Sequence, residues 1–308
     1  MLYIKSYKNN NSYFLNLSTK EKISLTTNNL ITKVIYCYFN NTIFVLASEE
    51  IIRYTSFGEF IDKKSIKNII NFDICDEYIL FNFVGDIFGI YQMENDHSSN
   101  KLICNLIHTI ENRKISNIFF NKDDKNQLFY SDDNSLFIFN IKANTEINIK
   151  SDIKNNIVNF LGFKLLSVYN KLNCCISIYN LDNLDKSIKK INIGSIVYKI
   201  ISNNNNIVIL CDRFKFNIKI YEMLTFNLLK NINLNVYFQN LYNVGDIIFG
   251  NEDEIFISCK FKDENKSYKT SIIKFNACNE EFEIIMECDK SDDIVLTYIP
   301  EVVEYLLK

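Results

Sequence analysis

The chain has 308 residues, of which 47% are hydrophobic and 23% are charged, and its formal net charge is −3. This mild acidity excludes a protein whose whole surface is built to coat nucleic acid. No run approaches the roughly 18 uninterrupted apolar residues of a membrane span, and the first residues lack a secretory core. We therefore expect a cytoplasmic or nuclear protein that makes no membrane contact.

The nine cysteines include no Cys-x-x-Cys pair, and their number is odd. Several lie inside apolar stretches, such as Cys174, Cys175 and Cys211. This pattern indicates buried thiols in a reducing compartment and not a disulfide framework or a metal site.

The predicted elements begin with two apolar stretches, at residues 13–17 and 23–25, which we interpret as outer strands without a matching inner strand. Six similar units follow. In each, an apolar strand leads to a second one, then to a short polar turn and then to an aliphatic run that ends in an aromatic residue. These six aromatic residues are Tyr54, Tyr91, Phe139, Tyr179, Tyr221 and Phe275.

The aromatic residues recur at steps of 37 to 54 residues. A four-stranded propeller blade of the WD-repeat type takes about 40–45 residues and tends to end its third strand in Trp-Asp. The chain has no Trp, and Tyr or Phe stands at that place. A smaller ring can supply most of the same apolar contact between neighbouring blades. The spacing predicts an all-β chain of blade-sized units.

The two ends of the chain are predicted to close the ring. Residues 294–298 have the pattern of an inner strand without outer ones, and pairing them with residues near 13–25 would make a seventh blade without an exposed edge. Beyond this strand, Pro300 precedes a stretch, residues 301–308, that can form a short C-terminal helix. The sequence thus predicts one domain over residues 1–308, a seven-bladed WD-repeat-like β-propeller.

Candidate catalytic residues are few. His97 lies in a polar connection, and we expect His108 to have a structural role near a turn. Cys104 and Glu111 flank His108 at helical spacing, but on a strand the three would be separated by roughly 10–13 Å, which disfavours a metal site. No glycine-rich phosphate loop is present. We expect no catalytic residue, no cofactor and no metal.

Charge is distributed unevenly along the second half of the chain. The stretch from Lys186 to Lys230 has eight basic residues against two acidic ones, and the stretch from Glu280 to Asp293 has the opposite balance. A propeller would put the two stretches on different blades, giving the disc a basic side and an acidic side. The basic stretch is either a solvated surface or a patch that faces phosphate or an acidic partner.

The chain resembles WD-repeat proteins over most of its length. In detail it is similar to the non-catalytic propeller subunit of the eukaryotic tRNA (guanine-N7) methyltransferase. The stretches that carry the resemblance are residues 77–81 leading to 85–88, residues 107–118, Asp123-Asp124, the turn 132–134, residues 207–212 and residues 302–308.

This resemblance implies a propeller without a methyl-donor site, which steadies a catalytic partner and reaches tRNA through the complex. In that family, basic residues around a third-strand turn of a middle blade make the contact. Here the positions after that turn are Ser135, Leu136 and Phe137, which are not basic. We expect the contact to use two turns that open on one face of the disc together with a basic pair. The residues concerned are Asp132, Asp133, Asn134, Lys189, Lys190, Arg213 and Lys215.

Two other functions stay open. The propeller could be an interaction platform in another intracellular complex, such as a vesicle coat, a ribosome-associated complex or a ubiquitin ligase. It could also be an enzyme with its active site in the central channel. That alternative requires three or more ionisable side chains that converge on the channel.

Overall fold

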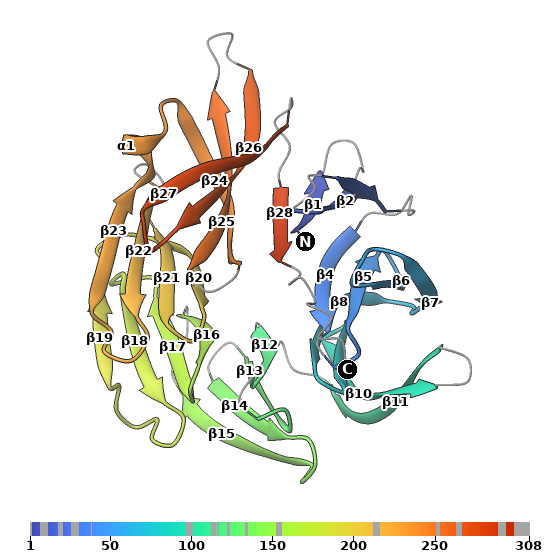
Figure 1. Cartoon of the computed structure of the whole chain (residues 1–308). Helices are drawn as coiled ribbons and strands as arrows, with labels where there is room; N and C mark the ends of the chain where they lie inside the picture. Colours follow the sequence, from blue (N-terminus) through green and yellow to red (C-terminus); the bar gives the residue numbers. More distant parts are fainter. Residues whose placement is uncertain are drawn as a thin grey trace, which may run out of the picture.

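The computed structural model describes residues 2–6, 12–17, 21–25, 31–37, 39–96, 101–111, 115, 117–121, 124–132, 135–151, 156–211, 216–250, 253–262, 267–288 and 294–298. The strands form four-stranded antiparallel sheets around a ring (Figure 1). The all-β propeller that the aromatic spacing predicts is confirmed.

Six blades are built from four consecutive strands, numbered here from the innermost strand outward. Blade 1 has β4 (Ile31–Cys37), β5 (Thr42–Ala47), β6 (Glu50–Thr55) and β7 (Phe60–Ser65). Blade 2 has β8 (Ile69–Cys75), β9 (Tyr78–Phe83), β10 (Ile87–Asp96) and β11 (Lys101–Ile110). Blade 3 has β12 (Asn117–Phe120), β13 (Gln127–Ser131), β14 (Ser135–Asn140) and β15 (Thr145–Ser151).

The second half of the chain repeats the arrangement. Blade 4 has β16 (Asn156–Gly162), β17 (Leu165–Asn170), β18 (Cys175–Asn180) and β19 (Lys189–Asn192). Blade 5 has β20 (Val197–Ser202), β21 (Asn206–Cys211), β22 (Asn217–Glu222) and β23 (Leu228–Asn233). Blade 6 has β24 (Leu241–Phe249), β25 (Glu254–Lys262), β26 (Tyr268–Asn276) and β27 (Glu281–Cys288).

A further sheet, which we call the composite sheet, joins the two ends of the chain. Its order is β28 (Ile294–Tyr298), β1 (Leu2–Ser6), β2 (Ser12–Leu15) and β3 (Lys22–Ser24). The inner strand β28 lies between blade 6 and β4 of blade 1. The propeller therefore has six blades of consecutive strands, and the seven blades of the prediction are reached only by adding the composite sheet.

The predicted pairing of the two ends needs a correction. Residues near 13–25 do not pair with residues 294–298. Instead β28 pairs with β1, from Leu2↔Tyr298 to Ser6↔Ile294, and β1 pairs with β2. The sequence analysis missed β1 because five residues are too few to show a clear alternation.

The six marker aromatics pack between blades, as expected. Each lies on the third strand of its blade, within an apolar cluster shared with the preceding blade. Tyr54 meets Phe14 of the composite sheet edge to face, with ring centroids 5.8 Å apart. Phe275 is fully buried among residues of blade 5 and blade 6. The repeat in the sequence is therefore the contact that holds consecutive blades together.

The structure contains one helix among its described residues, α1 (Leu234–Tyr237), in the connection between blades 5 and 6. The side chain of Asn233 caps it by accepting a hydrogen bond from the backbone N–H of Asn235 at 3.0 Å. The sequence analysis did not predict this helix. The predicted C-terminal helix, residues 301–308, lies outside the described residues.

Candidate binding surfaces

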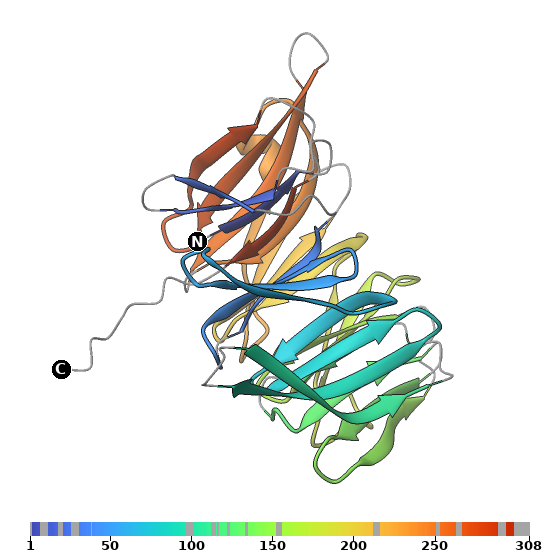
Figure 2. The same ribbon diagram turned by 90° about the vertical axis from the view of Figure 1, so that its right-hand side faces the viewer.

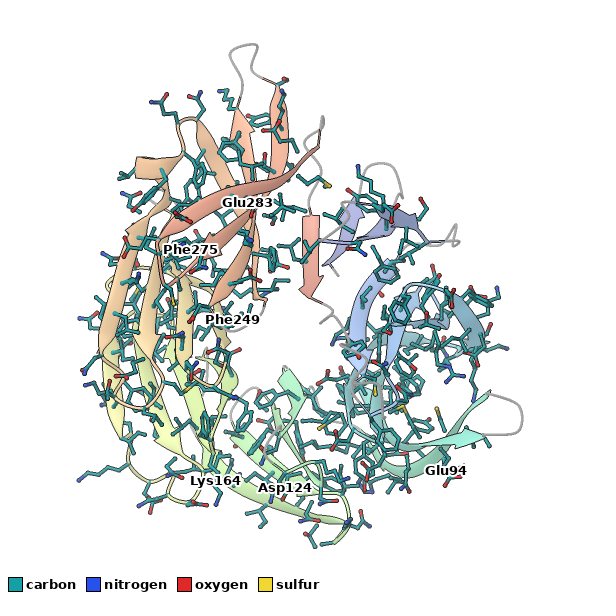
Figure 3. All side chains as sticks on the ribbon, in the orientation of Figure 1. Glu94, Asp124, Lys164, Phe249, Phe275 and Glu283 are labelled. Carbon is teal, nitrogen blue, oxygen red and sulfur yellow. The ribbon has the colours of Figure 1, made fainter. Side chains whose placement is uncertain are left out.

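A cavity of about 440 Å³ lies where the inner strands of five blades end near one another. Its lining comes mainly from the carboxyl ends of β8, β12, β20 and β24, with a contribution from β16. Phe249, labelled in Figure 3, is at the end of β24. The lining residues are Asp73, Ile74, Cys75, Phe119, Phe120, Asn159, Phe160, Ile200, Ile201, Ser202, Ile248 and Phe249.

The chemistry of this lining is mostly apolar. Asp73 is its only carboxylate, Cys75 adds a thiol, and Asn159 and Ser202 are neutral. A channel enzyme was expected to bring three or more ionisable side chains together. Among the lining residues that the structure describes, this requirement is not met. The cavity is suited to apolar contact and not to acid–base chemistry.

The predicted turn in blade 3 has a structural bond at its first residue. The Asp132 side chain accepts a hydrogen bond from the backbone N–H of Ser135 at 2.7 Å, which closes the turn between β13 and β14. Asp133 and Asn134 lie outside the described residues, as do Arg213 and Lys215 in the matching turn of blade 5.

Lys189 and Lys190 are exposed on β19, the outer strand of blade 4. Because they are consecutive on a strand, their side chains point to opposite faces of the sheet. Asp132 belongs to the adjacent blade 3, at a turn and not on an outer strand. Of the seven predicted residues, the structure thus describes three, and it places them on two different blades.

The basic stretch is partly neutralised by partners far away in the sequence. Lys199 forms an ion pair with Asp246, and Lys230 forms one with Glu280 at 2.8 Å. The ammonium group of Lys219 donates to the backbone carbonyl of Ile193 at 3.0 Å. The pair Lys230–Glu280 joins the predicted basic stretch to the predicted acidic one, because blades 5 and 6 are adjacent. A simple division into a basic side and an acidic side is therefore wrong.

The histidine on β11 packs between blades. The ring of His108 stacks on Phe139 of blade 3, with centroids 4.5 Å apart. Cys104 instead packs in the cluster that blade 2 shares with blade 1. The two side chains lie on opposite sides of the sheet, which agrees with the expectation that they do not share a metal. Within the described part of the chain, no group of three metal-binding side chains occurs.

The eight cysteines that the structure describes are free thiols. Cys37, Cys211 and Cys259 are buried, as expected, whereas Cys278 is exposed. Burial raises the pKa of the Cys259 thiol to about 12. The prediction of buried thiols is therefore right for these three and wrong for Cys278, which lies in a turn where the sequence pattern gives no sign of burial.

The sequence analysis missed an aromatic surface at one end of blade 6, which we call the blade 6 crest. Its exposed members lie in α1, at the start of β24 and where β25 and β26 project beyond neighbouring blades (Figures 1 and 2). The rings of Tyr242 and Tyr268 lie 4.7 Å apart. The 54-residue step before Phe275 was the available signal, because it leaves room for nine-residue strands. The crest consists of Val236, Tyr237, Tyr242, Lys262, Tyr268 and Lys269.

No family model matches the chain, and no curated protein matches it. Solved structures do. Hsv2 of Kluyveromyces lactis is 13% identical with a TM-score of 0.60, over 82% of this chain and 74% of that one. The WD40 repeats of RRP9 are 10% identical with a TM-score of 0.55, over 85% and 82%. The chain has a WD40-type β-propeller fold.

An enzyme is also among the similar structures. The dihydro-heme d1 dehydrogenase NirN, solved with DHE, is 9% identical with a TM-score of 0.63, over 96% of this chain and 74% of that one. At such identities the likeness concerns the fold alone. No helix in the described ranges is long and apolar enough to span a bilayer. Function has to be argued from the surfaces of this chain.

Proposed function

We propose that the chain is a non-catalytic WD-repeat scaffold that binds a partner protein through the blade 6 crest. The observation that carries the proposal is the exposure of large apolar and aromatic side chains there. Val236, Tyr237 and Tyr242 are 76%, 48% and 55% exposed. Aromatic residues are enriched at the centres of protein interfaces, because they bury much area at a low entropic cost.

The composition of the central cavity supports the same proposal. Its apolar lining offers no set of acid, base and nucleophile, so the propeller works through binding and not through chemistry. The proposal treats residues 1–308 as one domain of the cytoplasm or nucleus, and the free thiols of the described cysteines fit a reducing compartment. A single cooperative unfolding transition would support the one-domain assignment, and two separate transitions would contradict it.

The test is quantitative affinity purification from the source cells with the wild-type chain and a crest variant, Val236→Ser with Tyr242→Ala. The control variant is Phe57→Ala, because Phe57 is 60% exposed in a turn between the third and fourth strands, at the opposite end of a blade. We expect a stable partner that is lost at least tenfold with the crest variant and kept with the control. Equal recovery with all three proteins would contradict the crest as the binding surface.

A finer form of the proposal identifies the partner as the catalytic subunit of a tRNA (guanine-N7) methyltransferase, with tRNA reached through the complex. It is supported by the sequence resemblance and by the exposure of Lys189 and Lys190 on β19. Recovery of a methyltransferase subunit in the purification would support it. Recovery of a vesicle-coat, ribosome-associated or ubiquitin-ligase component would replace it.

The contribution of the basic residues to RNA binding is tested in the assembled complex. Replacement of Lys189, Lys190, Arg213 and Lys215 by Ala should weaken tRNA binding and reduce the salt dependence by about one unit of slope per lost phosphate contact. The measurement is tRNA affinity at several salt concentrations. An unchanged affinity and slope would show these residues to be an ordinary solvated surface.

A further inference from the structure

The outer strand of blade 2 differs from the outer strands of the other blades in length. An outer strand is a sheet edge with unpaired backbone groups, to which another strand can bond. β11 has ten residues, whereas the other outer strands have between three and eight. This edge is thus the longest one on the rim of the ring (Figure 1).

β11 also lacks the charges that protect the other edges. Charged side chains on an edge strand discourage pairing with another chain. From Ile103 to Ile110 the strand has the sequence Ile-Cys-Asn-Leu-Ile-His-Thr-Ile, without an acidic residue, a lysine or an arginine. Every other outer strand contains at least one charged residue, for example Lys22, Asp62, Glu146, Lys189, Lys230 and Glu283.

Aliphatic side chains are exposed in the middle of this edge. Ile103, Leu106 and Ile107 are 42%, 56% and 40% exposed. A bulge shifts the register between β10 and β11, so that Tyr91 pairs with Leu106 while Ile90 pairs with His108, and Ile107 has no partner of its own.

The bulge places Leu106 and Ile107 on the same face of the sheet. Leu106 shares the face of its partner Tyr91, which packs toward blade 1. Ile107 points away from its neighbour His108, whose ring packs toward blade 3. Similar bulges occur between the third and fourth strands of other blades. A bulge is therefore no special protection of this edge.

The exposed strand is complementary to itself in antiparallel pairing. A two-fold axis between Leu106 and Ile107 sets Leu106 opposite Ile107 of the second copy, and Ile103 opposite Ile110. The polar positions then meet as well, Asn105 with His108, and Cys104 meets Thr109. Each pair shares one face of the joined sheet, because the alternation and the bulge are the same in both copies. Isologous contacts of this kind build closed dimers.

From the length, the missing charges and the self-complementary pattern, we infer that β11 pairs with β11 of a second copy of this chain. The resulting homodimer has two ring-shaped scaffolds joined edge to edge through one continuous eight-stranded sheet. A single strand seam is smaller than a standard interface of about 1,600 Å². We therefore expect a dissociation constant on the order of 10–100 µM. This inference does not depend on the proposed partner at the crest.

The test is sedimentation equilibrium of the purified chain between about 5 and 300 µM, with two single variants and their combination. Leu106→Lys and Ile107→Glu each place an unmatched charge in the seam, and each should weaken the dimer at least tenfold. The double variant sets the introduced lysine opposite the introduced glutamate of the other copy on both sides of the axis, and we expect it to recover the dimer. The control is Leu228→Lys, since Leu228 is 50% exposed on β23, another outer strand.

Circular dichroism and the thermal midpoint show that each variant is folded before it is compared. A wild-type chain that is monomeric throughout the range would overturn the inference. A dimer that persists in both single variants, or one that the control also abolishes, would place the contact elsewhere and overturn it too. Failure of the double variant to dimerise would overturn the register, and pairing of β11 with a different protein in place of a second copy would overturn the homodimer.

Discussion

The composite sheet and blade 5 occupy equivalent places in the ring but are assembled in different ways. Blade 5 uses four consecutive strands within residues 197–233, so its turns align its edges. The composite sheet depends on the pairing of β1 with β28, at opposite ends of the sequence. Among the described residues, the apolar cluster at the junction of blades 5 and 6 is also much larger than that between blade 6 and the composite sheet.

A polar clamp reinforces the weaker junction. The Asp246 carboxylate on β24 accepts a hydrogen bond from the backbone N–H of Leu296 at 3.0 Å and forms an ion pair with Lys199 of β20. One side chain thus connects the inner strands of blade 5, blade 6 and the composite sheet. The comparison teaches that local contacts assemble the consecutive blades, whereas the closing sheet depends on a few contacts between distant residues.

The largest expected effect breaks the closing sheet. Leu296→Ala removes a buried side chain that packs with Leu15, Phe256 and Ile272, and should lower the free energy of unfolding by about 3 kcal/mol. Ile220→Ala in blade 5 should cost a similar amount. Hydrogen exchange separates the two, because only Leu296→Ala should expose the amides of β1 by local opening. Equal loss of protection at β1 in both variants would refute the comparison.

Removal of the polar clamp should have the next largest effect. Asp246→Ala leaves the Leu296 N–H without its acceptor and Lys199 without its partner, and should cost about 2 kcal/mol in urea unfolding. Asp182→Ala is the control, because the pair of Lys164 and Asp182 is more than half exposed on both sides. Such pairs contribute little. If the two variants are equally stable, the clamp does not reinforce the ring.

A smaller effect is expected at the junction of blades 4 and 5. The buried Tyr169 hydroxyl accepts a hydrogen bond from the backbone N–H of Val197 at 3.1 Å. Tyr169→Phe leaves that donor unpaired and should cost about 1 kcal/mol, measured by urea unfolding. Tyr198→Phe changes an exposed tyrosine and should leave stability within error. A neutral Tyr169→Phe would show that water replaces the lost acceptor.

The smallest effect concerns pH at the junction of blades 5 and 6. Burial raises the pKa of Cys259 from its ordinary value of 9.0 to about 12, so the unfolded chain loses this proton first as the pH rises. The thiol therefore contributes stability below pH 9 that is lost progressively between pH 9 and 12. At pH 10 the wild type should have lost about 1 kcal/mol more than Cys259→Ala, relative to pH 7. Parallel pH profiles would contradict this assignment.

The sequence predicted the contacts that repeat and missed those that occur once. The aromatic residues at the ends of the third strands predicted the blades, because the same packing recurs in every unit. β1 was missed because its pairing with β28 has no local signature, and α1 because four residues show no helical period.

The binding surfaces were harder to predict. The charge runs suggested a basic patch, but Lys199 and Lys230 are paired with Asp246 and Glu280, which the linear sequence cannot reveal. The blade 6 crest depends on strands that outgrow their neighbours. Only the long interval before Phe275 hinted at it, and an interval does not indicate which side chains are exposed.

The order in which the strands are synthesised gives the β1–β28 pairing a biological consequence. About 290 residues separate the two strands, so at about 5–20 residues per second the ribosome needs roughly 15–60 s between them. During that time β1 has an open edge to which a neighbouring nascent chain could bond. We therefore expect early strands of this protein to require shielding by a chaperone until translation delivers the last strand.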